Sequence, residues 1–218
     1  MLGLYVNVPI ACFRKGLARE YLETETLPPP ATCYGFLLSL VGEIDRRRHT
    51  GVRVTPVLLG KPPTSVVLRT VWRVKKLPLG SSGNTRPDYQ QLLTEVQLVI
   101  WLDSADESSE EGAKLEARVS TALVDPSSVN RFGGLSLGES THLVDEVSSI
   151  TRLAERAPGR LEQPARAFLV RDRGRYTLPT WVDHVGSAKT RYATGDLVEC
   201  LPQVAPQLFE LPMIGPDY

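Results

Sequence analysis

The chain has 218 residues, of which 42% are hydrophobic and 23% charged, and its 25 basic and 25 acidic side chains give a formal net charge of zero. This composition is typical of a globular protein of one full domain with a small appendage, and it argues against a non-specific binder of polyanions. No run approaches the ~20 consecutive apolar residues that span a bilayer, and the N-terminal segment lacks the basic region of a signal peptide.

The cysteines are odd in number and far apart, at Cys12, Cys33 and Cys200. Their spacing matches no zinc site, and it does not predict a disulfide framework. The sequence also has no His/Asp/Glu cluster of the kind that holds a metal. We therefore expect a protein of the reducing cytoplasm, with no metal and no cofactor.

The charges are distributed unevenly along the chain. Residues 46–92 contain ten basic residues and one acid, whereas residues 95–116 contain seven acids and one base. A chain polarised in this way can present a phosphate-binding face while staying neutral overall. The simpler alternative is that these runs are the solvated faces of separate elements.

Residues 2–12 alternate with a period of two and predict a strand, which a loop with Arg14 and Lys15 follows. A run of three prolines then precedes a helix, which we expect to begin near Thr32 with that residue as a candidate cap. We expect arginines 46–48 to end this helix, because cations suit the negative end of the helix dipole. Contact with RNA is the alternative role of these arginines.

The next part of the chain predicts a hairpin with a long tip. Residues 65–76 and 95–102 contain alternating apolar residues and are expected to pair, whereas residues 52–59 form a short strand that the pattern leaves unplaced. Residues 77–91 have no apolar period and are rich in turn formers. A tip of this length is usually functional or disordered, and the basic residues at its base favour function.

A second helix and a strand follow the hairpin. The acidic segment 103–111 is expected to start the helix, because carboxylates suit the positive end of the dipole. Apolar residues recur at helical spacing between Leu115 and Leu123, and Asp125 with the proline after it ends the pattern. Residues 141–150 predict the strand.

This order of elements is β-α-β-β-α-β, which predicts an α+β class and a ferredoxin-like domain over residues 1–150. Residues 151–218 are expected to form a small β-rich C-terminal lobe. Within it, residues 151–164 read as a connector or short helix, and residues 167–170 and 175–180 as a hairpin.

Residues 131–140, Arg-Phe-Gly-Gly-Leu-Ser-Leu-Gly-Glu-Ser, form a glycine-rich loop between the second helix and the last strand. Glycines allow positive φ and close approach of a ligand, and successive backbone N–H groups in such a turn can bind phosphate. Arg131 adds a fork that can hold the same anion twice. The alternative is an ordinary glycine-rich loop before an edge strand.

Two motifs resemble those of the CRISPR-associated Cas-five family, in the RAMP superfamily. Residues 27–43 open with Leu-Pro-Pro-Pro-Ala-Thr-Cys-Tyr-Gly, which is similar to the family's Pro-Ser/Thr-x-Tyr-Gly helix opening but one residue longer. Residues 131–140 resemble its glycine-rich loop, with a Leu-Ser-Leu-Gly-Glu/Arg-Ser core. The resemblance covers residues 1–150, is looser beyond them, and is nearest to the type I-A/I-B-like branch.

The resemblance implies a subunit of the Cascade surveillance complex that holds the 5′ handle of crRNA and caps the backbone filament. Its projecting thumb, residues 75–93, would pack against the adjacent backbone subunit, and the large subunit would dock nearby to read target DNA. A single-stranded handle can be held by backbone amides and cations while its bases are splayed. The residues expected to contact RNA are Arg14, Lys15, Thr32, Tyr34, Arg73, Lys75, Lys76, Arg131, Gly133, Gly134, Ser136, Gly138 and Ser140.

Two other functions stay open. One branch of the resembled family cuts precursor repeat RNA without metal, which needs a general base and a general acid close together. His142 is the candidate for such a role here, and a packing histidine is its simpler explanation. The third hypothesis is an unrelated ferredoxin-like domain that binds a nucleotide with its glycine-rich loop. We expect a non-catalytic RNA-binding scaffold.

Overall fold

The computed structural model describes residues 1–16, 21–72, 75, 78–108, 112–185 and 188–218. Nine strands form one sheet with the order β6-β1-β5-β3-β7-β9-β8, and β2 and β4 pair with β5 outside this path. The strands are β1 Leu2–Ala11, β2 Tyr21–Leu22, β3 Arg53–Leu59, β4 Thr64–Trp72, β5 Thr85–Asp103, β6 Glu146–Ser149, β7 Ala165–Val170, β8 Tyr176–Trp181 and β9 Arg191–Cys200. The α-helices are α1 Pro30–Leu40, α2 Leu115–Val124 and α3 Ile150–Arg156.

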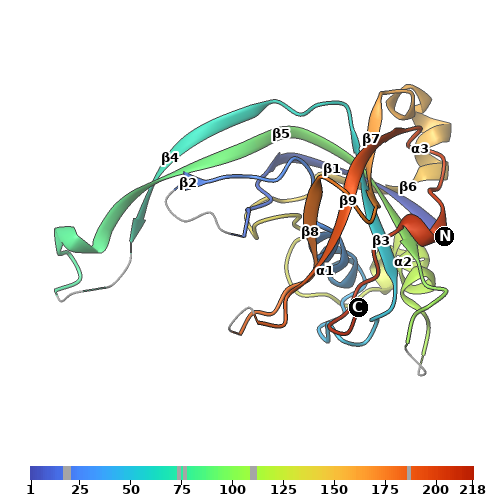
Figure 1. The fold of residues 1–218 in the computed structure, drawn as a ribbon, viewed down its shortest axis with the longest axis horizontal. Helices are drawn as coiled ribbons and strands as arrows, with labels where there is room; N and C mark the ends of the chain where they lie inside the picture. Colours follow the sequence, from blue (N-terminus) through green and yellow to red (C-terminus); the bar gives the residue numbers. More distant parts are fainter. Residues whose placement is uncertain (17–20, 73–74, 76–77, 109–111, 186–187) are drawn as a thin grey trace.

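Helices cover both faces of the sheet (Figure 1). Leu4 and Val6 of β1 alternate with Tyr5, so the first two side chains join the core beneath α1 and α2, and Tyr5 joins the core beneath α3. The strand β5 alternates in the same way, with Leu98 and Val99 on opposite faces. No helix in the described ranges combines the length and apolarity that crossing a membrane requires.

The segment that the sequence left unplaced, β3, is a central strand. It pairs antiparallel with β5 on one side and with β7 on the other. The core strands β6, β1, β5 and β3 therefore lie side by side, with α1 between β1 and β3 in the chain and α2 between β5 and β6. The prediction that residues 65–76 supply this core strand was wrong, because β4 pairs with β5 beyond the end of β3.

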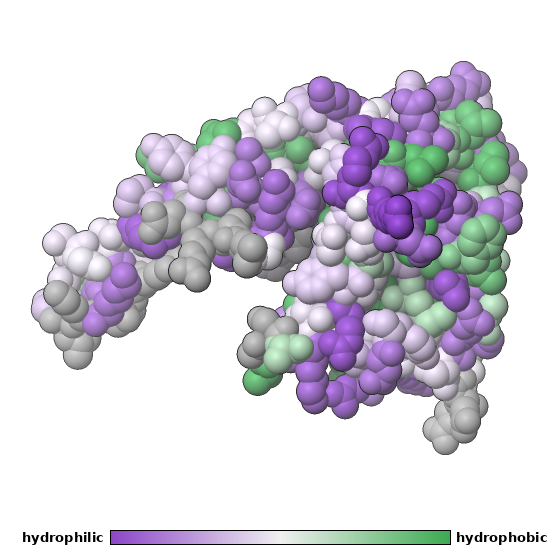
Figure 2. All heavy atoms as spheres, in the orientation of Figure 1, coloured by the Kyte–Doolittle hydropathy of each residue, from purple (hydrophilic) through white to green (hydrophobic). Residues whose placement is uncertain are grey.

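The projecting hairpin is longer than predicted and is mostly strand. Its two strands pair from Thr64 opposite Leu93 to Trp72 opposite Thr85, and they extend away from the body as an arm (Figure 1). Part of the predicted tip, from Thr85 on, is therefore strand. The space-filling view shows the arm standing clear of the rest of the molecule (Figure 2). We call residues 64–93 the arm.

Both long helices differ in extent from the prediction. α1 begins at Pro30 after Pro29, with no side-chain cap, so Thr32 lies inside its first turn. It ends at Leu40, and the arginines expected to finish it follow in turns. α2 begins at Leu115, since the acidic segment before it forms turns rather than helix where it is described.

The C-terminal strands also differ from the prediction. β7 and β8 were expected to form a hairpin, but both pair with β9, which lies between them. β6 covers only Glu146–Ser149 of the predicted strand 141–150. Because β7 pairs with β3, residues before and after position 150 contribute to one continuous sheet.

Gly42 lies just after α1 and packs against Asn130, the residue before the glycine-rich loop. Its φ of +68° permits the terminal turn in which the Gly42 amide bonds Ser39 and the Glu43 amide bonds Leu38. A Cβ at this position would overlap the carbonyl oxygen of Asn130. The end of α1 and the chain before the glycine-rich loop therefore pack backbone against backbone.

Replacing Gly42 with alanine is expected to lower the free energy of unfolding by about 1–3 kcal/mol, because the positive φ is strained for any residue with a Cβ. Urea denaturation measures this change. The control is Gly35→Ala, an exposed position within α1 where a Cβ meets nothing within 4 Å. Alanine should stabilise that helix by up to about 1 kcal/mol, and equal effects of the two variants would contradict the prediction.

Candidate nucleic-acid interface

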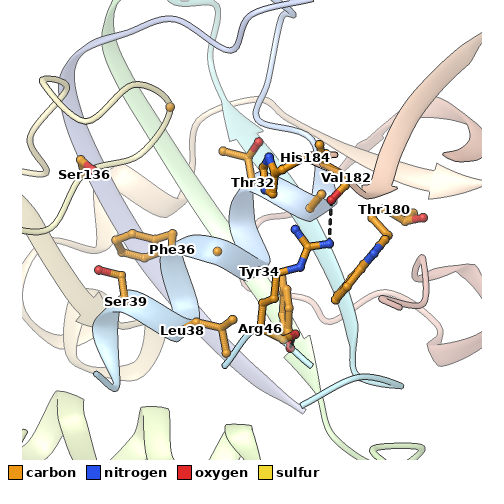
Figure 3. Close-up of a pocket in the computed structure, with 14 residues that line it drawn as sticks. Thr32, Tyr34, Phe36, Leu38, Ser39, Arg46, Ser136, Thr180, Val182 and His184 are labelled. Carbon is orange, nitrogen blue, oxygen red and sulfur yellow. Dashed lines mark hydrogen bonds between the residues drawn. The ribbon is translucent and has the colours of Figure 1, made fainter. Parts of the chain in front are cut away.

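A groove of about 440 Å³ brings together the start of α1, the glycine-rich loop and the end of β8 (Figure 3). Thr32 and Tyr34 come from α1, and Ser136 and Gly138 from the loop. These four residues were predicted from two motifs about 100 positions apart in the sequence, and the fold places them on one groove. Hydroxyl groups and the first turn of a helix are groups that bind phosphate in other proteins.

One wall of the groove is an ordered aromatic and arginine stack. The guanidinium carbon of Arg46 lies 4.0 Å from the ring centroid of Trp181, and its Nη2 donates to the carbonyl of Val182 at 2.6 Å. The Tyr34 hydroxyl donates to the carbonyl of Arg46 at 2.8 Å, and burial raises the pKa of this hydroxyl so that it stays a donor. The cation is thus fixed at the groove rather than free in solvent.

The glycine-rich loop has the backbone shape that its glycines predict. Gly133 has a φ of +75° and Gly138 a φ of +101°. A Cβ at Gly138 would lie 2.7 Å from the carbonyl oxygen of Cys12, closer than packing allows. Leu137 is buried beside it and Ser136 bridges to Leu143, so this half of the loop is anchored in the fold.

His142 anchors the same half of the loop to the end of β1. Its Nδ1 accepts hydrogen bonds from the backbone amides of Cys12 and Glu139, both at 3.2 Å. The side chain is buried, and burial lowers its pKa more than the negative charge of Glu139 raises it. Because Nδ1 accepts two bonds, this nitrogen carries no proton in the folded state.

Glu139 connects the loop to the arm. Its carboxylate accepts from Gln90 of β5 at 2.9 Å and from Arg69 of β4 at 3.4 Å. Arg69 also donates to Gln90. A change in the position of the glycine-rich loop therefore has to disturb side-chain contacts at the inner part of the arm.

The remaining predicted residues lie outside the groove. Arg131, Gly133, Gly134 and Ser140 are exposed on the loop but do not line the groove. The Lys15 ammonium lies 3.7 Å from the Glu23 carboxylate. Arg14 pairs with Thr24 through the backbone as an isolated β-bridge, and Lys75 is exposed in the arm. The positions of Arg73 and Lys76 fall outside the described residues.

The sequence reasoning missed the β8 side of the groove. Trp181, Val182 and His184 follow the predicted strand 175–180, and the sequence pattern assigned them no role. Arg46 was assigned to a helix end, although its neighbour is an aromatic ring 135 positions away. A tryptophan after an alternating strand was the one available signal.

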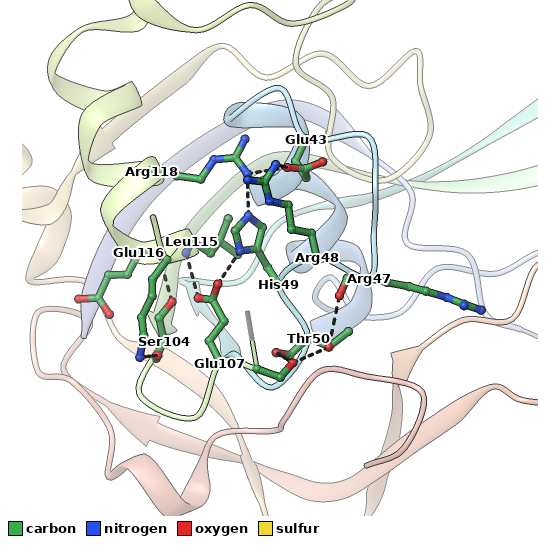
Figure 4. Close-up of polar contacts among 12 residues, drawn as sticks. Glu43, Arg47, Arg48, His49, Thr50, Ser104, Glu107, Leu115, Glu116 and Arg118 are labelled. Carbon is green, nitrogen blue, oxygen red and sulfur yellow. Dashed lines mark hydrogen bonds and ion pairs between the residues drawn. The ribbon is translucent and has the colours of Figure 1, made fainter. Parts of the chain in front are cut away.

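Behind the groove, a buried polar network joins α1 to α2 (Figure 4). His49 is fully buried, with Nε2 2.7 Å from Arg118 and Nδ1 2.5 Å from Glu107. A guanidinium only donates, so Nε2 is the acceptor and Nδ1–H donates to Glu107. The second oxygen of Glu107 accepts from the amide of Leu115 at 2.9 Å and so caps α2.

The same network holds Glu43 at the end of α1. Arg118 donates to its carboxylate at 2.6 Å and Arg48 at 3.1 Å. Burial alone would raise the pKa of Glu43, but the bonds from Arg118 and the Asp45 amide, with the Arg48 charge, outweigh it and hold the pKa at about 2. This carboxylate therefore stays charged at any physiological pH, and the described residues form no cluster suited to a metal ion.

No protein-family model matches the chain. A curated protein of Myxococcus xanthus (strain DK1622), named CRISPR-associated protein Cas5, is 51% identical over 216 residues, which cover 98% of this chain and 97% of the relative. A chain of a CRISPR RNA-guided surveillance complex is similar in fold, with a TM-score of 0.58 at 13% identity over 90% of this chain and 89% of that one. A crystal structure of a Cas protein has a TM-score of 0.51 at 17% identity, over 99% and 98%.

Replacing His142 with alanine is expected to lower the free energy of unfolding by about 1–3 kcal/mol at neutral pH, because two amides lose their acceptor. The folded-state pKa is below the ordinary 6.5, so the unfolded chain binds the proton more tightly. The wild type should therefore lose the stability that neutral His142 contributes as the pH falls below about 6.5. The free energy of unfolding of the variant should fall less over the same pH range. Urea denaturation at neutral pH and near pH 5 tests this, with exposed His184→Ala as control, and identical pH dependence in wild type and variant would contradict it.

Proposed function

Because the chain belongs to the Cas5 family of CRISPR-associated proteins, we propose that it is a non-catalytic subunit of a type I Cascade surveillance complex that binds the 5′ handle of crRNA. The observation that carries the proposal is the single groove shared by α1, the glycine-rich loop and Arg46. In this role it caps the backbone filament and supports recognition of target DNA by the assembled complex. We place it in the cytoplasm and in the type I-A/I-B-like branch.

The groove has the chemistry of a single-stranded RNA site. Backbone amides of the glycine-rich loop suit phosphate oxygens. At the start of α1 the Ala31 amide can add to them, since Pro30 has no N–H and the amides of Thr32 and Cys33 donate to the Pro29 carbonyl. The Arg46 guanidinium offers a plane and a charge, and Thr32 and Ser136 offer hydroxyl groups. RNA single strands are commonly held by such contacts while their bases stack on planar side chains.

The arm supports a thumb that begins earlier than the expected residues 75–93 and includes β4. Val66, Leu68 and Trp72 alternate along β4 and are 50%, 61% and 61% exposed, and Tyr89 opposite Leu68 is 51% exposed. The Tyr21 ring packs beside the Tyr89 ring, tilted by 43° with centroids 6.4 Å apart. An apolar face of this extent on a projecting hairpin is suited to packing against another subunit, and we assign the backbone subunit of Cascade to it.

We also assign the ferredoxin-like RAMP fold to residues 1–150. The core order β6-β1-β5-β3, with α1 and α2 as crossovers, supports this assignment because a β-α-β-β-α-β unit places its last strand beside its first. The strands from β7 onward extend the sheet past β3 and belong to the predicted C-terminal lobe. The large subunit of the complex is a further expected partner, docked near the handle and the thumb.

The alternative, a metal-independent endoribonuclease, is less well supported. Its candidate, His142, uses Nδ1 as an acceptor for two backbone amides and is buried. A general base needs a nitrogen that reaches the 2′-OH of the substrate, with an acid nearby. The packing role of His142 accounts for its position without catalysis.

The test of the proposal is binding of purified protein to end-labelled repeat RNA in EDTA, read on native and denaturing gels. We expect a shift without cleavage that is lost when the handle is scrambled. Arg131→Ala should weaken handle binding by ~1.5–3 kcal/mol, the range for a hydrogen bond to a charged group. The control is Arg152→Ala, an exposed arginine of α3, and equal losses would remove Arg131 from the site.

A discrete metal-independent cut that His142→Ala abolishes would establish the endoribonuclease instead. Binding of a free nucleotide without RNA affinity would favour the third hypothesis, a nucleotide-binding domain.

Shortening the arm should block assembly and leave the fold intact. One variant replaces residues 80–86 with a short turn and keeps Lys75 and Lys76, and a second carries Leu68→Ser with Trp72→Ser. These side chains are 61% exposed, so their loss should cost the isolated protein little stability. Co-purification with the other Cascade subunits and crRNA measures assembly, and normal assembly of both variants would refute the thumb assignment.

A further inference from the structure

A second groove, of about 420 Å³, lies beside the first and carries three cationic side chains. Arg47 comes from the turns after α1, and Lys189 and Arg191 from the segment that leads into β9. Thr50 and Pro216 complete the lining, with Asp217 as its one acidic residue. We call Arg47, Lys189 and Arg191 the basic groove.

These cations form no salt bridge within the described residues, unlike several arginines of the protein. Arg48, Arg53 and Arg118, for example, each form a salt bridge. Within the part of the chain that the structure describes, no carboxylate lies within salt-bridge distance of the basic-groove side chains, Asp217 included. The Lys189 charge also acts on the nearby Asp183 carboxylate, so the charges of Arg47 and Arg191 are the ones most available to a ligand.

The backbone of the basic groove is held in place although its charged ends are free. The Arg47 amide donates to Asp45 at 2.9 Å, and the Arg47 carbonyl accepts from the Thr50 hydroxyl at 3.3 Å. The Lys189 amide donates to Asp183 at 3.2 Å. Figure 4 shows the Arg47 side chain extending away from the buried network of its neighbours.

Two pairs of neighbouring residues are divided between the basic groove and the proposed handle site. Arg46 lines the first groove and Arg47, the next residue, lines the second. Trp181 lines the first groove, and its strand partner Arg191 lines the second. The two grooves are therefore formed by neighbouring parts of the same two segments, the turns after α1 and the β8–β9 pair.

We propose that the basic groove binds backbone phosphates of a single-stranded nucleic acid, independently of base sequence. It would hold the stretch of RNA that continues beyond the handle, and this identification of the strand rests on the proposed function. Cations without fixed partners suit phosphates because they release condensed counterions on binding. The groove has no aromatic side chain among its lining residues, so no stacking of bases is expected there.

The test compares the salt dependence of binding to two probes, the handle RNA extended by a short oligouridine at either end and oligouridine alone. The variant carries Arg47→Ala, Lys189→Ala and Arg191→Ala. Each phosphate contact to a single strand contributes about 0.7 to the slope of log K against log salt, so the triple variant should lose about 2 from that slope. A single Asp217→Asn variant should bind both probes more tightly.

The matched control removes three arginines elsewhere, with Arg152→Ala, Arg166→Ala and Arg173→Ala, and so changes the net charge equally. If this control and the basic-groove variant show the same slope for both probes, the proposal is overturned. Unchanged RNA binding with loss of a Cascade subunit on co-purification would likewise overturn it, since the partner would then be protein. Thermal unfolding confirms that both variants are folded.

The two proposals fail separately. If the wild type shows no preference for the handle over a scrambled sequence, yet the basic-groove variant loses salt-dependent binding to oligouridine, the groove is supported and the handle function is not. If handle preference persists and oligouridine binding is insensitive to the variant, the groove proposal falls and the handle function stands.

Discussion

The arrangement of the protein depends on one long strand, β5, that belongs both to the core sheet and to the arm. The 19 residues of β5 pair with β1 and β3 in the core and with β4 and β2 in the arm. Backbone hydrogen bonds therefore carry the arm directly from the sheet. Glu95, where β5 changes partner from β3 to β4, has a φ of +56°, the one non-glycine residue with positive φ in the described chain. Such a conformation is held only where the surrounding pairing fixes it.

The proposed RNA site is built around this strand from parts that are each held by a different interaction. Backbone packing at Gly42 fixes the end of α1, and the two bonds accepted by His142 fix the glycine-rich loop. The loop in turn contacts the arm through Glu139. These contacts arrange the groups proposed to bind phosphate before any ligand arrives, and such preorganisation reduces the entropy lost on binding.

The buried network of His49, Glu107 and Arg118 has a structural consequence for the same site. It joins the turns after α1 to the start of α2, and the side chains of His49 and Glu107 in it are fully buried. Each partner satisfies the other, whereas removal of one would leave a buried charge unpaired. The turns that carry Arg46 and Arg47 are thereby held against the body of the protein.

The sequence by itself determined part of the local structure and the two motifs. Alternation identified β1 and the core half of β5, and the glycine pattern of residues 131–140 matches the positive φ at Gly133 and Gly138. Tertiary structure alone decided which strand is central, that β9 separates β7 from β8, and that Arg46 stacks on Trp181. Periodicity reports which side of a strand is buried but not its neighbour, because pairing is set by contacts between residues far apart in the chain. The basic groove is also a feature that only the tertiary structure decides, because no local sequence pattern shows which cations lack a salt-bridge partner.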